Sequence, residues 1–211
     1  MAGPLIIAID GPAASGKGTL ARRLAAHFGL RHLDTGLIYR AVGAAVLAGG
    51  LDLGDAAAAE AAARGLDLGG FDREALSRHE VGEAASRVAA MPGVRAALLE
   101  AQRAFGRTAP GAVLDGRDIG TVVFPEAAAK LFVTADVGER ARRRTAEMAG
   151  RGLAADYDAI LADLRRRDER DSTRASAPLK AAGDAAVLDT TALDADAAFA
   201  AALALVQQRL G

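Results

Sequence analysis

Short apolar runs alternate along the chain with longer stretches in which hydrophobic residues recur every three or four positions. The longer stretches have the spacing of helices that bury one face. Alternation of strand-like and helix-like segments predicts βαβ units around a parallel sheet, and therefore an α/β fold. Strands are expected at 5–10, 31–34, 112–115, 130–135 and 186–190.

The predicted helices lie between and after these strands. The first begins at Lys17, and its Leu20 and Leu24 fall on one face, as packing against a sheet requires. Pro92 is expected to break what would otherwise be one long helix. The alanine-rich segment 54–70 has the composition of a surface helix, because alanine has the highest helix propensity. Further helices are expected at 36–48, 80–90, 93–105, 137–148, 156–171 and 194–209.

Composition limits the domain count and the class of partner. A chain of 211 residues, 51% of them hydrophobic, suffices for one core, so 1–211 is predicted to be a single domain with insertions at 50–106 and 145–175. The 26 basic and 27 acidic side chains nearly cancel, which disfavours a nucleic-acid binder and favours small ligands. The absence of cysteine excludes disulfides and thiolate chemistry. The first apolar run is too short for a signal peptide or a membrane span, so we expect a cytoplasmic protein without membrane attachment. We also expect a monomer.

The strongest chemical signal is "GPAASGK" at 11–17, which fits the phosphate-binding pattern G-x-x-x-x-G-K between a strand and a helix. Its glycines let backbone N–H groups turn inward, and the helix amino terminus adds partial positive charge. Lys17 is expected to reach the β- and γ-phosphates. The predicted ATP-binding residues are Gly11, Pro12, Ala13, Ala14, Ser15, Gly16, Lys17, Gly18 and Thr19.

Gly18 stands where a hydroxyl usually follows the lysine, so one direct magnesium ligand is missing. No direct protein ligand is therefore assigned. We expect Mg²⁺ near Thr19 and Asp115, held through phosphates and water. Asp115 ends the third predicted strand, where a carboxylate can orient magnesium-bound water opposite the phosphate cradle.

Two further stretches place polar residues at the carboxyl ends of strands, where open α/β sheets bind ligands. In "LDTGLIYR" at 33–40, Asp34 and Thr35 are candidates for capping the next helix, whereas Tyr39 and Arg40 are placed to bind a second phosphate. "DTG" also occurs in aspartic proteases, but those need two such aspartates on all-β lobes. In "VLDGRDIGTVVFP" at 113–125, Arg117 and Asp118 follow the strand directly and favour a functional role over a simple turn.

Eight of the ten residues in "RRRDERDSTR" at 165–174 are charged. Salt bridges on a solvated helix explain many such mixtures. A protein that neutralises two polyphosphates and shields them from water needs a mobile lid that carries arginines, and this segment fits that need. Arg167 and Arg170 are the predicted catalytic lid residues, beside Lys17 and Asp115.

Together these motifs resemble the bacterial cytidylate kinases, nucleoside monophosphate kinases of the P-loop superfamily. The resemblance runs from about residue 5 to residue 205. It rests on "IDGPAASGKGTLA", "LDTGLIYRAV", "AASRVAAMPGVR", "LDGRDIGTVVFP", "RRDERDSTRASAPL" and "VLDTT", which occur in the family's order. The first motif alone indicates only a P-loop kinase, whereas the third to fifth are specific to this family.

The resemblance implies a three-layer P-loop kinase fold with a five-stranded parallel sheet in the order 2-3-1-4-5, a monophosphate-binding insert and a short lid. It implies transfer of the γ-phosphoryl group of ATP to CMP or dCMP with Mg²⁺. Asp118, Arg95 and Ser86 match base-reading positions, Arg40, Arg117 and Arg174 match ligands of the CMP phosphate, and Thr35, Arg167 and Asp171 match positions near ribose and phosphate. Together with Tyr39, which the position after the second strand already suggested, the predicted CMP-binding residues are Thr35, Tyr39, Arg40, Ser86, Arg95, Arg117, Asp118, Arg167, Asp171 and Arg174.

Several alternatives stay open at the level of sequence. The amphipathic helices that carry Ser86 and Arg95 are also compatible with solvent-facing side chains. Segment 50–80 is shorter than the β-rich insert of many family members and lacks an alternating strand pattern. His27, His32 and His79 have no metal-ligand spacing and are interpreted as structural or surface residues. Another small-molecule kinase, or a nucleotide-binding switch without transfer activity, would share the phosphate loop.

Overall fold

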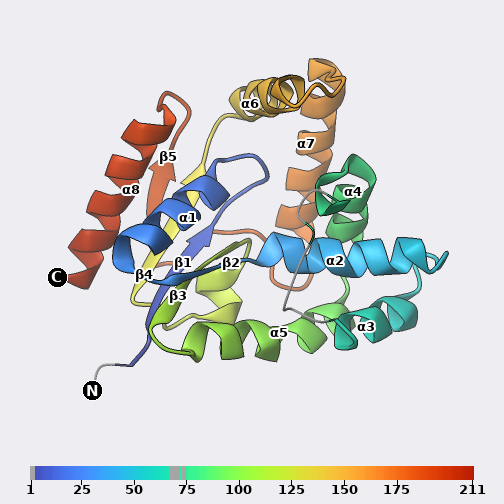
Figure 1. Cartoon of the computed structure of the whole chain (residues 1–211), viewed down its shortest axis with the longest axis horizontal. Helices are drawn as coiled ribbons and strands as arrows, with labels where there is room; N and C mark the ends of the chain where they lie inside the picture. Colours follow the sequence, from blue (N-terminus) through green and yellow to red (C-terminus); the bar gives the residue numbers. More distant parts are fainter. Residues whose placement is uncertain (1–2, 67–71, 73–74) are drawn as a thin grey trace.

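The predicted parallel sheet is present. The computed structural model describes residues 3–66, 72 and 75–211, except the side chains of Ser77 and His79. Its five strands are parallel and lie in the order β2-β3-β1-β4-β5, which confirms the expected topology (Figure 1). They are β1 (Leu5–Asp10), β2 (Arg31–Asp34), β3 (Gly111–Gly116), β4 (Ala129–Thr134) and β5 (Ala186–Asp189).

Helices cover both faces of this sheet, because β1 is apolar on both sides. Ile7 and Ile9 pack against α1 (Lys17–Phe28) and α8 (Ala195–Leu210). Ile6 and Ala8 belong to a second core cluster with α2 (Thr35–Ala48) and α5 (Pro92–Arg107). A strand buried on both faces reads as a continuous hydrophobic run, as "LIIAI" does.

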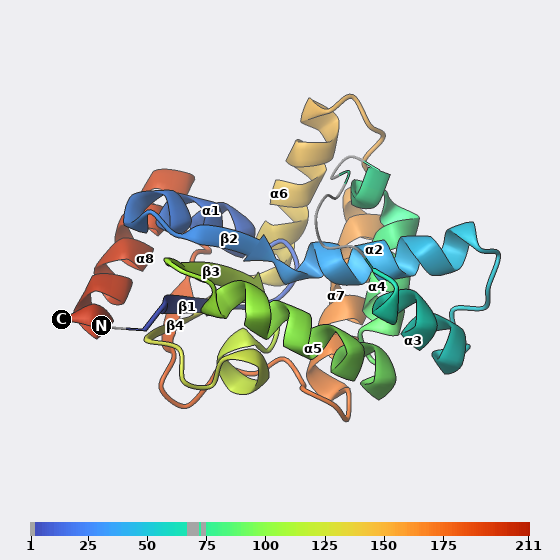
Figure 2. The same ribbon diagram turned by 60° about the horizontal axis from the view of Figure 1, so that its bottom comes forward.

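Two helical extensions stand away from the sheet (Figure 2). The first consists of α3 (Ala56–Arg64), a 3-10 turn (Ala75–Ser77) and α4 (His79–Val88), which pack on α2 and α5. The second is a pair of packed helices, α6 (Val137–Gly150) and α7 (Tyr157–Thr173). The regular secondary structure in the described part of 50–80 is thus helical. None of the described helices combines the length and the apolar character needed to cross a membrane.

Helix breaks and ends follow the sequence closely, with one exception. Pro92 begins α5, as expected from its missing N–H. The alanine-rich helix covers 56–64 of the predicted 54–70, and 67–70 lie outside the described residues. The π-helical turn Ile119–Val123 after β3 was not predicted. Apolar periodicity does not reveal it, because its distinguishing feature is a hydrogen-bond pattern one residue wider than that of an α-helix.

Candidate active site

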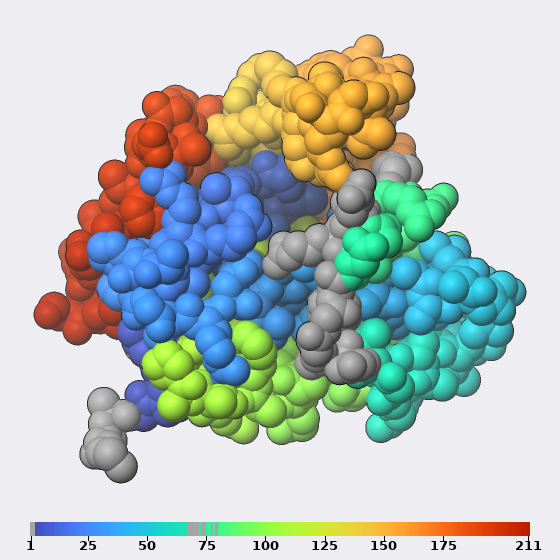
Figure 3. All heavy atoms as spheres, in the orientation of Figure 1, coloured from blue at the N-terminus to red at the C-terminus, as the bar shows by residue number. Residues whose placement is uncertain are grey.

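A cleft of about 940 Å³ lies at the carboxyl edge of the sheet. Its walls come from the phosphate loop and α1, from α2 and α4, and from the α6–α7 pair. In Figure 3 the dark-blue atoms of the phosphate loop lie in a hollow beneath that pair. The cleft is therefore where an open α/β sheet is expected to bind ligands.

The phosphate loop has the backbone that its glycines predict. A Cβ at Gly11 would lie 2.0 Å from the carbonyl oxygen of Val133, so only glycine fits there. Gly16 has φ of 85°, and no side chain of the described residues caps α1 behind it. The first N–H groups of α1 remain available to an anion. The Lys17 Nζ donates to the carbonyl of Pro12 at 3.2 Å and so lies across the loop.

Burial, together with the nearby Arg117 guanidinium, lowers the pKa of Lys17 to about 8, and the Asp115 carboxylate opposes this shift. A charged ammonium is therefore costly in this position without an anion. A bound polyphosphate would remove that cost, because opposite charge at short range favours the ionised form. The electrostatics of Lys17 fit a phosphate ligand.

Asp115 faces the start of α1 and is held from two sides. The His32 Nε2 lies 2.7 Å from its Oδ1, and the Thr35 hydroxyl donates to its backbone carbonyl at 2.8 Å. A Cβ on Gly18 would lie 3.7 Å from the Asp115 Oδ2. His32 is thus a partner of a site residue, which the sequence did not indicate because the two are 83 positions apart. Asp34 accepts from the N–H of Leu37 at 3.3 Å and so caps α2, as one interpretation expected.

A second polar group that lines the cleft comes from α4, from α5 and from the residues that follow β3 and α7. Arg95 Nη2 donates to the Asp118 Oδ2, and the Arg174 Nη2 lies 3.7 Å from the Oδ1. Ser86 lines the same cleft, and its buried hydroxyl has no hydrogen-bond partner among the described residues. Ser86 and Arg95 are 8% and 9% exposed. The alternative interpretation, that these two side chains face solvent, is therefore wrong.

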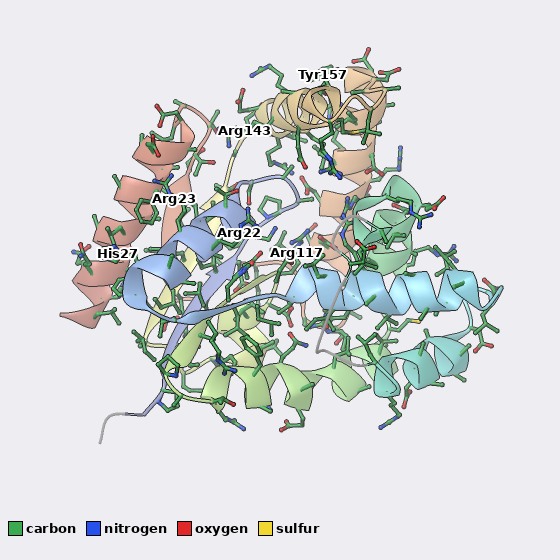
Figure 4. All side chains as sticks on the ribbon, viewed as in Figure 1. Arg22, Arg23, His27, Arg117, Arg143 and Tyr157 are labelled. Atoms are coloured by element: carbon green, nitrogen blue, oxygen red, sulfur yellow. The ribbon has the colours of Figure 1, made fainter. Side chains whose placement is uncertain are left out.

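Three further arginines, Arg40, Arg117 and Arg167, line the cleft. Arg117 is central (Figure 4), and its Nε donates to the Asp171 Oδ2 at 2.7 Å. Burial lowers the pKa of Arg40 to about 10, and the nearby positive charge of Arg167 adds to this effect. Burial likewise lowers the pKa of Arg167, with Arg117 contributing. Several guanidinium groups that disfavour one another's charge form a site suited to a polyanion.

The structure brings most of the predicted site together. Gly11 and Pro12, the first two residues of the loop, are not among the residues that line the cleft. Arg170 does not line it either. Its Nη2 pairs with the Glu83 Oε1 at 2.6 Å and so joins α7 to α4. The predicted residues that line the cleft are Ala13, Ala14, Ser15, Gly16, Lys17, Gly18, Thr19, Thr35, Tyr39, Arg40, Ser86, Arg95, Asp115, Arg117, Asp118, Arg167, Asp171 and Arg174.

Sequence reasoning missed two arginines of α6. Arg144 lines the cleft. Arg140 is buried, donates to the phosphate-loop carbonyl of Ala13 at 3.1 Å and forms two hydrogen bonds with the Asp168 carboxylate. Arg140 therefore connects the loop to both helices of the α6–α7 pair. The charged run 139–144 is the signal that could have indicated them, because it is comparable with the charged run at 165–174.

Comparison with known proteins agrees with this geometry. The family profile described as Cytidylate kinase matches residues 7–208. The cytidylate kinases of Xanthobacter autotrophicus and Methylocella silvestris are 64% and 62% identical to the chain, over 97% and 96% of its length and 98% and 94% of theirs. A solved structure of an uncharacterised protein from Eubacterium ventriosum has a TM-score of 0.55 at 14% identity, covers 96% of this chain and 98% of that one, and supports the fold alone. The phosphate loop, the second polar group and these full-length similarities agree, and the chain belongs to the cytidylate kinase family.

Proposed function

We propose that the cleft transfers the γ-phosphoryl group of ATP to CMP or dCMP and releases ADP with CDP or dCDP. One observation carries this proposal. A single cleft is lined by the phosphate loop, by the side chains of Asp118, Arg95 and Ser86 (the Asp–Arg–Ser group), and by several further arginines. Such an arrangement fits two nucleotides that meet at their phosphates.

The Asp–Arg–Ser group complements cytosine. Cytosine presents an N4 amino donor beside the N3 and O2 acceptors. The Asp118 carboxylate would accept from N4, while Arg95 and the unpaired hydroxyl of Ser86 would donate to the ring acceptors. Uracil presents N3–H and O4 instead, which leaves mismatched groups in a buried site and costs affinity.

Transfer in this cleft needs no strong base, because the attacking oxygen of the CMP phosphate is already an anion. Positioning and charge stabilisation are then the main tasks of the protein. Lys17 would hold the β- and γ-phosphates of ATP, and Arg40, Arg117 and Arg174 would hold the phosphate of CMP. We propose that Thr35 and Tyr39 complete this subsite. Arg167 and Asp171 would lie near ribose and phosphate.

The residues around Asp115 fit a magnesium ion. The Asp115 carboxylate faces the first turn of α1, where Gly18 leaves space, and carboxylate oxygens suit Mg²⁺. Thr19 lies in the same turn. No group of three or more His, Asp or Glu side chains among the described residues is arranged to hold a metal, so phosphates and water would supply most of its ligands. When bound, Mg²⁺ neutralises charge on the transferring phosphate oxygens.

The proposal assigns 50–106 as the monophosphate-binding insert and 145–175 as the lid. Arg170 would reach the transferring group only after its ion pair with Glu83 opens, so its catalytic role depends on lid movement. We propose that the protein is a monomer. We also propose that this monomer works in the cytoplasm.

A coupled assay of ADP release tests the function. We expect turnover with CMP and dCMP, and much lower turnover with UMP, AMP, GMP or shikimate, each with ATP and Mg²⁺. Turnover with shikimate or AMP above that with CMP would assign the cleft to another small-molecule kinase. ATP binding without ADP release on any acceptor would indicate a nucleotide-binding switch.

Gly82→Ala is expected to raise the KM for CMP several-fold. The added Cβ would lie 3.0 to 3.3 Å from the Arg40 guanidinium, which must then shift from the carbonyl of Leu76 that it contacts at 2.8 Å. The KM for ATP is expected to stay unchanged, because Gly82 lies on α4, which stands apart from the start of α1 (Figure 1). Steady-state kinetics with each substrate varied would check this. Gly65→Ala, on the end of α3, is the control, since its Cβ meets only carbonyl oxygens at 3.6 Å or more. Equal increases in both KM values would contradict the assignment of Arg40 to CMP.

A further inference from the structure

The first two N–H groups of the π-helical turn after Asp118 donate to a side chain of β1, a strand distant in the sequence. Asp10, the last residue of β1, accepts from the N–H of Ile119 through Oδ1 and from the N–H of Gly120 through Oδ2, both at 2.8 Å. Asp10 is only 4% exposed. A Cβ at Gly120 would lie 3.4 Å from this carboxylate and 3.1 Å from the Lys130 side chain, so a residue without a side chain allows the close approach.

Asp118 occupies the position from which an aspartate normally caps its own helix. In this chain five other helices begin after an aspartate that does so, at Asp34, Asp55, Asp136, Asp156 and Asp194. Asp118 makes no such bond to the described residues. The N–H of Gly120 is a donor that a capping Asp118 would use, and Asp10 already occupies it.

The turn is also fixed at its other end. Arg103 of α5 donates from Nε to the carbonyl of Val123 and from Nη2 to that of Val122, each at 3.1 Å. The Asp10 carboxylate at the amino end of the turn and the Arg103 guanidinium at its carboxyl end match the polarity of the backbone dipoles of the turn. Burial raises the pKa of Asp10 to about 6, although both N–H groups oppose this shift, so the carboxylate is ionised above neutral pH.

We propose that Asp10 is a positioning residue for base recognition. By holding the N–H groups of Ile119 and Gly120, it leaves the Asp118 carboxylate turned toward Arg95 and Arg174 in the cleft. Asp10 touches neither nucleotide in this proposal. The inference rests on the proposed base-reading role of Asp118, and it extends the site to a residue of β1 that directly precedes the phosphate loop.

A double-mutant cycle at mildly alkaline pH tests the proposal. The variants are Asp10→Asn, Asp118→Asn and the double variant, and the measurement is the ratio of kcat/KM for CMP to that for UMP with ATP saturating. An asparagine at position 10 offers one acceptor oxygen, so either the Ile119 or the Gly120 N–H loses its partner. The Asp118 carboxylate can then turn to that free N–H and away from the cleft. We expect Asp10→Asn to lower the ratio about tenfold. In the Asp118→Asn background the same change is expected to leave the ratio unaltered.

Three readouts separate this role from a general structural one. The KM for ATP is expected to stay within about twofold of wild type in Asp10→Asn. Asp194→Asn is a control for loss of a carboxylate charge at the start of a helix, because Asp194 accepts two backbone N–H groups through its Oδ1 at the start of α8, and it is expected to leave the CMP to UMP ratio unchanged. Equal reduction of the ratio by Asp10→Asn in both backgrounds would overturn the proposal. So would a raised KM for ATP with an unaltered ratio, which would mean that Asp10 supports the phosphate loop instead.

Amide hydrogen exchange decides the matter if Asp10→Asn fails to fold. In the wild-type protein without nucleotide, the N–H groups of Ile119 and Gly120 are expected to exchange as slowly as those in the middle of β1. Asp118→Asn is expected to leave this protection in place. Exchange at the rate of exposed loop amides would show that the cap does not form, and the proposal would fail. An unchanged CMP to UMP ratio in Asp118→Asn, with the two amides still protected, would refute the base-reading role and leave the cap itself intact.

Discussion

Lys17→Ala is expected to reduce phosphoryl transfer below detection while the protein stays folded. The substitution removes the positive charge that the phosphate loop places near the β- and γ-phosphates, where electrostatic stabilisation contributes most to this class of reaction. Folding is expected to survive, because the Lys17 Nζ makes one hydrogen bond, to Pro12, and burial already lowers the pKa of Lys17 to about 8. Removing a group whose charged form is disfavoured by its surroundings costs the fold little.

The measurement is ADP formation with CMP and ATP at saturation, with circular dichroism and thermal unfolding of each variant. Lys180→Ala is the control, because Lys180 is exposed and lies outside the cleft. It is expected to keep wild-type turnover. Near-normal turnover in folded Lys17→Ala would refute the assignment of the phosphate loop.

Asp118→Asn is expected to change the choice of base. The amide replaces an acceptor-only carboxylate with a group that also donates, so its NH₂ can turn to O4 of uracil. Transition-state binding of CMP is expected to weaken by about 1–3 kcal/mol, the range for a poorly matched buried polar group. The loss of charge also leaves the buried Arg95 guanidinium without its carboxylate partner, and thermal stability is therefore expected to fall.

The deciding quantity is the ratio of kcat/KM for CMP to that for UMP, in wild type and variant. Asp184→Asn serves as a control, because Asp184 also pairs with a buried cation, Lys130, away from the cleft. That control is expected to leave the ratio unaltered. If both pyrimidines slow equally in Asp118→Asn, the residue serves phosphate or metal positioning, and base reading falls to Ser86 and Arg95.

Local sequence patterns determine much of this protein. The strands and most helix bounds follow from apolar periodicity. The face on which a side chain lies depends only on the residue's position along its own helix or strand, so each type of element leaves its own repeat in the sequence. The phosphate loop is likewise local, since the backbone of 11–17 and the start of α1 form the anion site by themselves. The alanine-rich helix and the break at Pro92 follow from intrinsic propensity.

Site residues on separate elements are indicated only through the resemblance to a family. Ser86 and Arg95 look like ordinary helix positions, and their burial beside Asp118 depends on how α4, α5 and β3 pack. Hydrophobic pattern gives the apolar face of a helix, but it does not reveal a polar residue that is buried because a partner from another element satisfies it.

The tertiary structure alone decided the long-range polar contacts. His32 contacts Asp115 because β2 and β3 are neighbours, Arg170 pairs with Glu83 because α7 packs on α4, and Asp10 caps a turn 109 positions away. Each bond needs two segments brought together by the apolar core, and its geometry is set by that packing. The sequence by itself therefore determined the helices, the strands and the phosphate loop. The fold decided which polar groups pair across elements. The reason is that burial of apolar surface is non-directional and brings segments together, whereas directional hydrogen bonds form only where those segments meet.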